Sequence, residues 1–157
     1  FGYEGILAEP NPKQYKNISN LRNAKIENKC VWSESGSKLE FVDVADLSTL
    51  KKFSDSDMHS NARKNKSTFF VETISLTDML IKHKAPPLID YLSIDTEGSE
   101  FEILSAHNFD KYKFSVITVE HNFTFQREKI LKLLTKYGYK RKYEQLSGQD
   151  DWYVLNF

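Results

Sequence analysis

Residues 88–104 of the 157-residue chain read LIDYLSIDTEGSEFEIL. The stretch opens as an apolar run with β-branched residues, meets acids on both sides of Gly98, and ends in apolar residues at helical spacing. This order indicates a buried strand, a turn and a helix. Ligands bind at the carboxyl ends of strands in open α/β sheets, so Asp95 and Glu97 are expected beside a ligand. These acids could instead only stabilise the helix N-terminus, most readily Glu100, which lies inside the helix.

A second apolar run, residues 114–119, also ends in polar residues, Glu120 and His121. If the two strands are neighbours, their tips lie about 4.8 Å apart and these side chains can meet the first acids across a ligand. Two chemistries fit such a cluster. A hard divalent cation such as Mg²⁺ could be held by Asp95, Glu97, Glu120 and His121. Alternatively, one of the four could take a proton from a substrate while the others orient it.

The N-terminal part of the chain offers a third acid at a strand end. Residues 6–8 form a short apolar run that is followed by Glu9. In nucleotide-binding α/β folds, an acid at such a position accepts hydrogen bonds from ribose hydroxyls. Asn11 and Pro12 then predict a helix over 12–21, because asparagine caps helices and proline suits the first helical position.

Strands and helices alternate along the rest of the chain. That alternation predicts an α/β fold with a mostly parallel sheet covered on both faces, and a C-terminal hairpin adds an antiparallel edge. The strand at 69–73 is expected at a sheet edge. The further predicted strands cover 26–32 and 39–44, the helices 75–85, 99–106 and 124–138, and the hairpin 139–146 with 151–157.

Residues 46–68 are the least regular part of the sequence. Ser, Asp, Asn and Lys dominate this segment, and large apolar side chains are few. Such a composition is typical of a solvated, flexible loop, and the functional alternative is a lid over a site. The basic cluster Arg63–Lys66 is expected to be a solvated face.

The composition restricts the partners of the chain. It holds 22 basic and 22 acidic side chains, so the formal net charge is zero. This balance argues against nucleic acid and leaves a small molecule as the expected partner. No apolar run is long enough to span a bilayer, and Cys30 is the only cysteine, which excludes an internal disulfide. A single cytoplasmic domain over residues 1–157 is therefore expected.

Three motifs carry a resemblance to a known family. In order, they are EPNP at 9–12, SLTD at 75–78 and IDTEGSE at 94–100. With them the chain resembles the FkbM family of S-adenosylmethionine-dependent methyltransferases, from Gly5 to the C-terminal hairpin. The resemblance implies a Rossmann-like class I methyltransferase sheet with S-adenosylmethionine as the cofactor. It also implies methyl transfer to a hydroxyl oxygen of a small molecule or sugar.

The resemblance further implies roles for individual residues. Glu9 and Asn11 would bind the cofactor, Glu9 at its ribose, and Asp95 would contact the cofactor as well. The implied catalytic residues, which line the pocket near the methyl group or face the substrate, are Asp95, Glu97, Glu120 and His121.

Two features depart from the family pattern. Ser93 stands where the family has a lysine before the Ile-Asp pair. The family's first strand and its glycine-rich turn, which hold the methionine part of the cofactor, have no counterpart among these residues. The family's sheet order, 3-2-1-4-5-7-6, places that strand between the strands that end at Glu9 and Asp95. Its loss would leave a gap about one strand wide, with unpaired backbone on both sides. Either residues upstream of these supply the strand, or the sheet closes up, or another chain fills the gap.

Several expectations follow from this gap. The chain would be the C-terminal portion of a methyltransferase domain that binds S-adenosylmethionine weakly or not at all by itself. The incomplete sheet makes a homo-oligomer plausible. A domain without the glycine-rich turn could instead be a non-catalytic binding or assembly module, and a metal-dependent site is the third alternative.

Overall fold

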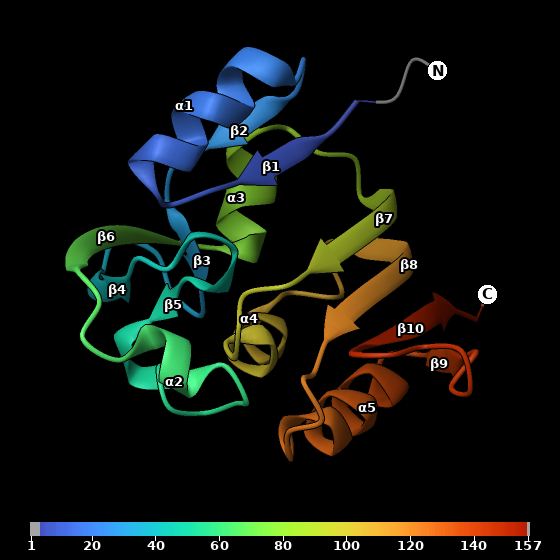
Figure 1. Ribbon diagram of the computed structural model, residues 1–157. Helices are drawn as coiled ribbons and strands as arrows, with labels where there is room; N and C mark the ends of the chain where they lie inside the picture. The colour runs from blue at the N-terminus through green and yellow to red at the C-terminus, as the bar shows by residue number, and fades with distance from the viewer. Residues whose placement is uncertain (1–3, 157) are drawn as a thin grey trace.

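The computed structural model describes residues 4–156, which form three β-sheets with helices around them (Figure 1). One sheet contains, in spatial order, β7 (Leu88–Ile94), β8 (Lys113–Glu120), β10 (Asp150–Leu155) and β9 (Tyr139–Lys142). A second contains β3 (Cys30–Trp32), β6 (Thr68–Ser75), β4 (Lys38–Val42) and β5 (Thr49–Leu50). The third pairs β1 (Ile6–Ala8) with β2 (Lys25–Glu27).

The pairing of β7 with β8 positions the acidic turn. The two strands run parallel with Ile94 opposite Val119, so Asp95 and Glu120 follow at the same edge of the sheet. The predicted hairpin is confirmed, because β9 and β10 pair antiparallel and β10 also pairs antiparallel with β8. Phe157, the last residue of the predicted hairpin, lies outside the described residues.

The β1–β2 sheet carries the N-terminal acid. β1 is parallel to β2 and leads into helix α1 (Pro12–Leu21). The Asn11 side chain accepts a hydrogen bond from the backbone N–H of Lys13, which confirms the predicted cap. Within residues 4–156, β1 pairs only with β2, and β7 pairs only with β8, so each has one unpaired edge.

The sheets differ from the single, mostly parallel sheet that the sequence predicts. In the described part of the chain, three strand pairings are parallel and four are antiparallel. The predicted strand at 26–32 is two strands, because its first part pairs with β1 and its second part pairs with β6 in another sheet. β6 is not an edge strand, because β3 pairs with one side of it and β4 with the other.

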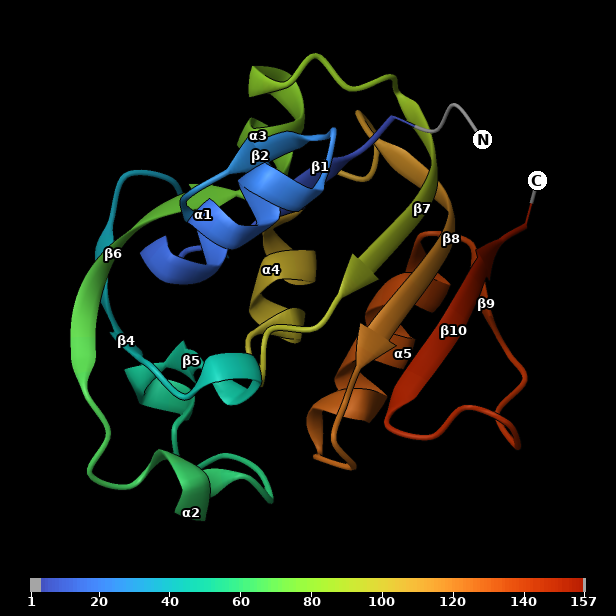
Figure 2. The same ribbon diagram turned by 45° about the horizontal axis from the view of Figure 1, so that its top comes forward.

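Three helices contribute to the main apolar core. α3 (Leu76–Lys82) follows Ser75, whose side chain caps the helix by accepting a hydrogen bond from the backbone N–H of Asp78. α4 (Glu100–Ala106) follows the acidic turn, and α5 (Gln126–Lys136) follows β8 (Figure 2). None of the helices within residues 4–156 is long and apolar enough to cross a membrane. The fully buried side chains of this core include Leu104, Ile117, Leu134 and Tyr153.

Residues 46–68 contain regular structure instead of the expected open loop. Arg63 is only 3% exposed, so the prediction of a solvated basic face is wrong for this residue. Lys64 and Lys66 are exposed, as predicted. Besides β5, the short elements of this region are two 3-10 helices (Ala45–Leu47 and Lys51–Phe53) and helix α2 (Ser60–Arg63).

Candidate functional site

The turn between β7 and α4 has an unusual backbone. Glu97 has a φ of 58° and Gly98 a φ of 118°, in the left-handed region that a glutamate rarely adopts. The Thr49 hydroxyl donates a hydrogen bond to the backbone oxygen of Glu97 at 2.9 Å. A Cβ added at Gly98 would lie 3.2 Å from the Cβ of Phe53. Residues 46–68 therefore pack directly against the acidic turn.

Glu100 stabilises this turn from inside. Its carboxylate accepts hydrogen bonds from the backbone N–H groups of Thr96 at 2.8 Å and Gly98 at 3.1 Å, and from the Thr96 hydroxyl at 2.8 Å. Burial raises the pKa of Glu100, and these hydrogen bonds oppose the rise. The structure thus favours the structural alternative for Glu100.

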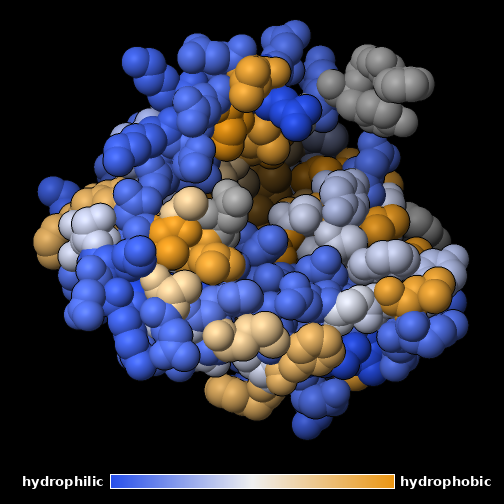
Figure 3. Space-filling model, viewed as in Figure 1, coloured by the Kyte–Doolittle hydropathy of each residue, from blue (hydrophilic) through white to orange (hydrophobic). Residues whose placement is uncertain are grey.

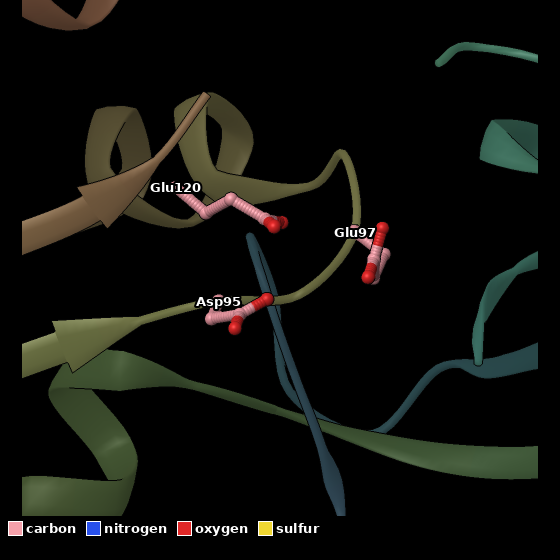
Figure 4. Close-up of side chains that lie close together, drawn as sticks. All are labelled: Asp95, Glu97 and Glu120. Carbon is pink, nitrogen blue, oxygen red and sulfur yellow. The ribbon is translucent and has the colours of Figure 1, made fainter. Parts of the chain in front are cut away.

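Three carboxylates meet where β7 and β8 end (Figure 4). One oxygen each of Asp95, Glu97 and Glu120 lies within 4.8 Å of the others. Glu97 and Glu120 are buried, whereas Asp95 is exposed. Burial, and then the negative charges of Asp95 and Glu97, raise the pKa of Glu120 to about 9. The structure therefore brings together three of the four residues expected at this crevice.

Arg63 places a positive charge beside this cluster. Its Nη2 donates to Glu97 Oε2 at 2.7 Å, and its Nη1 donates to both carboxylate oxygens of Asp57, at 2.8 and 2.9 Å. Nε donates to the backbone oxygen of Leu47 at 2.8 Å, and Asn122 Nδ2 lies 3.4 Å from the same Glu97 oxygen. Burial raises the pKa of Glu97, while the Arg63 charge opposes the rise. Sequence reasoning missed Arg63 and Asp57, because both lie in the segment whose composition predicted a loop.

His121 is adjacent in sequence to this cluster, but its ring lies beside Asp151, and its buried Nε2 has no hydrogen-bond partner among the described residues. Its Nδ1 accepts a hydrogen bond from the backbone N–H of Phe123 at 3.0 Å. The hydrogen of the neutral ring is then on Nε2, which lies 3.7 Å from Asp151 Oδ1. Asp151 is in turn held by Arg127 and Arg141. Burial lowers the pKa of His121, which favours the neutral ring. His121 is not part of the cluster formed by Asp95, Glu97 and Glu120.

A cavity of about 510 Å³ lies between β1 and β7. Figure 3 shows a hollow with apolar walls on this face of the molecule. Glu9 lines the cavity from the β1 side, and Asp95 and Glu97 line it from the β7 side. Its volume falls in the range of roughly 300–1,000 Å³ that is typical of small-molecule sites. The apolar lining includes Leu7, Leu50, Met79, Leu92 and Ile103.

Glu9 and Asn11 relate to the cavity in different ways. Glu9 lines it, with Oε1 accepting a hydrogen bond from the backbone N–H of Asn11 at 2.7 Å, and burial raises the pKa of Glu9. The Asn11 side chain caps α1 and donates from Nδ2 to Asp43 Oδ1 at 2.9 Å. Asn11 is not among the residues that line the cavity. The Asn11 side chain therefore stabilises the fold, and the Asn11 backbone N–H orients the Glu9 carboxylate.

The comparison with protein families agrees with these features. The family model of the methyltransferase FkbM domain matches residues 2–141, a range that includes Glu9, the acidic turn and the end of β8. No curated protein and no solved structure gives a significant match to the sequence. The family match covers most of the chain, and the chain therefore belongs to the FkbM methyltransferase family.

Proposed function

We propose that this protein transfers the methyl group of S-adenosylmethionine to a hydroxyl oxygen of a small molecule or sugar. Membership of the FkbM family supports the reaction class. The observation that carries the proposal is the single cavity lined by Glu9 on one side and by Asp95 and Glu97 on the other. Glu9, which could bind ribose hydroxyls, thus faces the same cavity as Asp95 and Glu97, which could act on the reacting groups.

The strand arrangement supports the same proposal. In a Rossmann-like class I methyltransferase sheet, β2-β1 and β7-β8-β10-β9 would be two parts of one sheet, separated by a parallel strand. Each of β1 and β7 has an unpaired edge within the described residues, and the cavity lies between the two strands. We infer that a segment outside these 157 residues supplies the strand between them. Its glycine-rich turn would hold the methionine part of the cofactor.

The residues of this chain would bind and orient the reactants. Glu9 would accept hydrogen bonds from ribose hydroxyls, with the backbone N–H of Asn11 holding its carboxylate in place. Asp95, which is exposed and lines the cavity, would orient the acceptor hydroxyl and take its proton. That proton must leave because an O–CH₃ bond forms as the S–CH₃ bond breaks. Holding both reactants in line lowers the barrier by proximity.

Glu97 also lines the cavity, whereas Glu120 and His121 line a smaller pocket beside the acidic turn. Glu120, whose pKa is raised by burial and by the neighbouring carboxylates, would donate a hydrogen bond while it is protonated. Glu97 is fixed by Arg63 and would orient its neighbours. His121 would have to turn away from Asp151 to reach an acceptor in the cavity. Asp95 is therefore the residue that we assign to proton removal.

A non-catalytic binding or assembly module is the second candidate function. The unpaired edges of β1 and β7 favour it, because a strand from another chain, including a second copy of this one, could fill the space between them. In that case the cavity would hold protein backbone and no cofactor.

Calorimetric titration with S-adenosylmethionine separates the two functions. We expect weak or no binding by the 157-residue chain, and clear binding by a chain extended with the residues encoded before Phe1. In the extended chain, Glu9→Gln should weaken binding at least about tenfold, since a charged hydrogen-bond acceptor is lost. Glu4→Gln, at an exposed position before β1, is the matched control and should bind normally. An extended chain that does not bind the cofactor would refute the enzyme, and tight binding by the 157-residue chain would refute the inserted strand.

A further inference from the structure

We propose that Asp95, Glu97 and Glu120 bind one hard divalent cation, such as Ca²⁺, Mn²⁺ or Mg²⁺, at the ends of β7 and β8. Such cations prefer oxygen ligands, and carboxylates are common among them. One oxygen of each side chain lies within 4.8 Å of the others (Figure 4). Two oxygens on opposite sides of one Ca²⁺ lie about 4.8 Å apart, twice a bond length of about 2.4 Å. The three oxygens are therefore close enough together to share one ion.

Glu120 is the residue that points to a ligand. It is only 8% exposed, and its carboxyl group is directed towards the other two (Figure 4). Its Oε2 is buried and accepts no hydrogen bond from any N–H or hydroxyl donor in the described part of the chain. A buried polar atom without a partner is unfavourable, because it has lost water and gained nothing in return. A cation held between the three side chains would be the missing partner.

The charges around the cluster are also unbalanced. Within residues 4–156, no Lys, Arg or His forms an ion pair with Asp95 or Glu120. The guanidinium of Arg63 is already shared between Glu97 and Asp57. Two carboxyl groups thus have no positive partner, and one divalent cation supplies the charge that balances both when they are ionised.

Two of the three proposed ligands, Asp95 and Glu97, line the large cavity, and Glu120 lines a smaller pocket beside the acidic turn. Arg63 and Asn122 both contact Oε2 of Glu97, so Oε1 of that residue makes neither contact. Asp95 is exposed, lines the cavity between β1 and β7 and offers only one oxygen to the ion, so its second oxygen stays available to the acceptor hydroxyl. The coordination positions that the three carboxylates do not fill would open towards this cavity, where water can occupy them.

Titration with Mn²⁺, followed by electron paramagnetic resonance, tests the site on the chelator-treated 157-residue chain. We expect one ion per chain, with a dissociation constant below about 1 mM, the weak end for carboxylate sites. Glu120→Gln and Asp95→Asn should each weaken binding at least about tenfold, because each removes a carboxylate ligand, which Glu120 becomes when the ion displaces its proton. Asp90→Asn, which changes an exposed acid on β7, is the matched control and should bind like the unmodified chain. Added Ca²⁺ should compete with Mn²⁺.

No Mn²⁺ binding at about 1 mM would overturn the proposal. Binding that survives both substitutions together would also overturn it, because the ion would then lie elsewhere. Circular dichroism shows whether Glu120→Gln folds. If Glu120→Gln does not fold, Asp95→Asn, at an exposed position, still tests the site. No S-adenosylmethionine is present in this titration, so its failure and a failure of the proposed methyl transfer are separate results.

Discussion

Arg63 Nη2 donates a hydrogen bond to Glu97 Oε2 at 2.7 Å, although the residues are 34 positions apart and both side chains are buried. Arg63 also binds Asp57 and the backbone of Leu47. Glu97 has the left-handed backbone conformation, with a φ of 58°. This contact therefore ties the 46–68 segment to the acidic turn at the point where the turn is strained.

Replacing Arg63 should test how much this contact stabilises the protein. Arg63→Met should lower the free energy of unfolding by about 3–5 kcal/mol, because it leaves Asp57 and Glu97 buried without their positive partner. Urea denaturation followed by tryptophan fluorescence measures the change. Lys64→Met, at the exposed neighbouring position, should stay within about 0.5 kcal/mol of the unmodified protein. Equal effects of the two substitutions would contradict the role given to Arg63.

Gly98→Ala should destabilise the turn. The φ of 118° disfavours any residue with a Cβ, and that Cβ would lie 3.0 Å from Ser56 Oγ. We expect a loss of about 1–3 kcal/mol in thermal unfolding experiments. Gly148→Ala is the control, since nothing lies within 4 Å of the added Cβ, and it should be neutral. Unchanged stability of Gly98→Ala would mean that the turn relaxes without cost.

Asn11→Ala separates a structural from a cofactor-binding role of this side chain. Loss of the cap should lower the free energy of unfolding by about 1 kcal/mol. The contact to Glu9 comes from the backbone N–H of Asn11, so it remains in the variant. Affinity of the extended chain for S-adenosylmethionine should therefore be nearly unchanged. A loss as large as that of Glu9→Gln would instead show that the Asn11 side chain contacts the cofactor, as the family resemblance implies.

His107 should make the protein sensitive to acid. Its Nε2 lies 3.1 Å from the backbone oxygen of Tyr112, and its Nδ1 lies 3.1 Å from the Thr77 hydroxyl. Burial lowers the pKa of His107 to about 4, although the Tyr112 carbonyl opposes this shift. Between the unfolded pKa of 6.5 and this value, the unfolded chain binds a proton that the folded chain does not. Stability from this residue is thus complete above pH 6.5 and falls as the pH decreases towards 4.

The size and the origin of this effect can be measured separately. The free energy of unfolding should be about 2 kcal/mol lower at pH 5 than at pH 7 from His107 alone. The difference should shrink in His107→Gln, whose side-chain amide can still donate to the Tyr112 carbonyl. Imidazole chemical shifts give the pKa of His107 directly. A titration midpoint near 6.5, the ordinary value, would contradict the assignment.

Much of the local structure and part of the site could be predicted from the sequence. Asp95 and Glu120 meet because the carboxyl ends of adjacent parallel strands lie at one edge of a sheet. Ser75 and Asn11 cap their helices because a short polar side chain can accept a hydrogen bond from the first helical turn. These features depend on neighbours in sequence or on one strand pairing, so short sequence patterns are enough to predict them.

The remaining features depend on contacts between distant segments. The composition around Arg63 is polar, and only the fold shows that its side chain is buried in ion pairs with Asp57 and Glu97. The 26–32 stretch passes from one sheet to another, and no residue pattern predicts which strand each half pairs with. The ring of His121 is directed to Asp151 on β10, a contact that spans 30 positions. Tertiary partners, rather than local preferences, decide these cases.

The most direct test of the central claim is a crystal structure of the extended chain with S-adenosylhomocysteine, the product left after methyl transfer. We predict that the ligand lies in the cavity between β1 and β7, with its ribose hydroxyls on the Glu9 carboxylate and its sulfur on the side of Asp95. We also predict an added parallel strand between β1 and β7. A ligand bound elsewhere, or a cavity filled by protein with no room for the nucleoside, would contradict the proposed methyltransferase site.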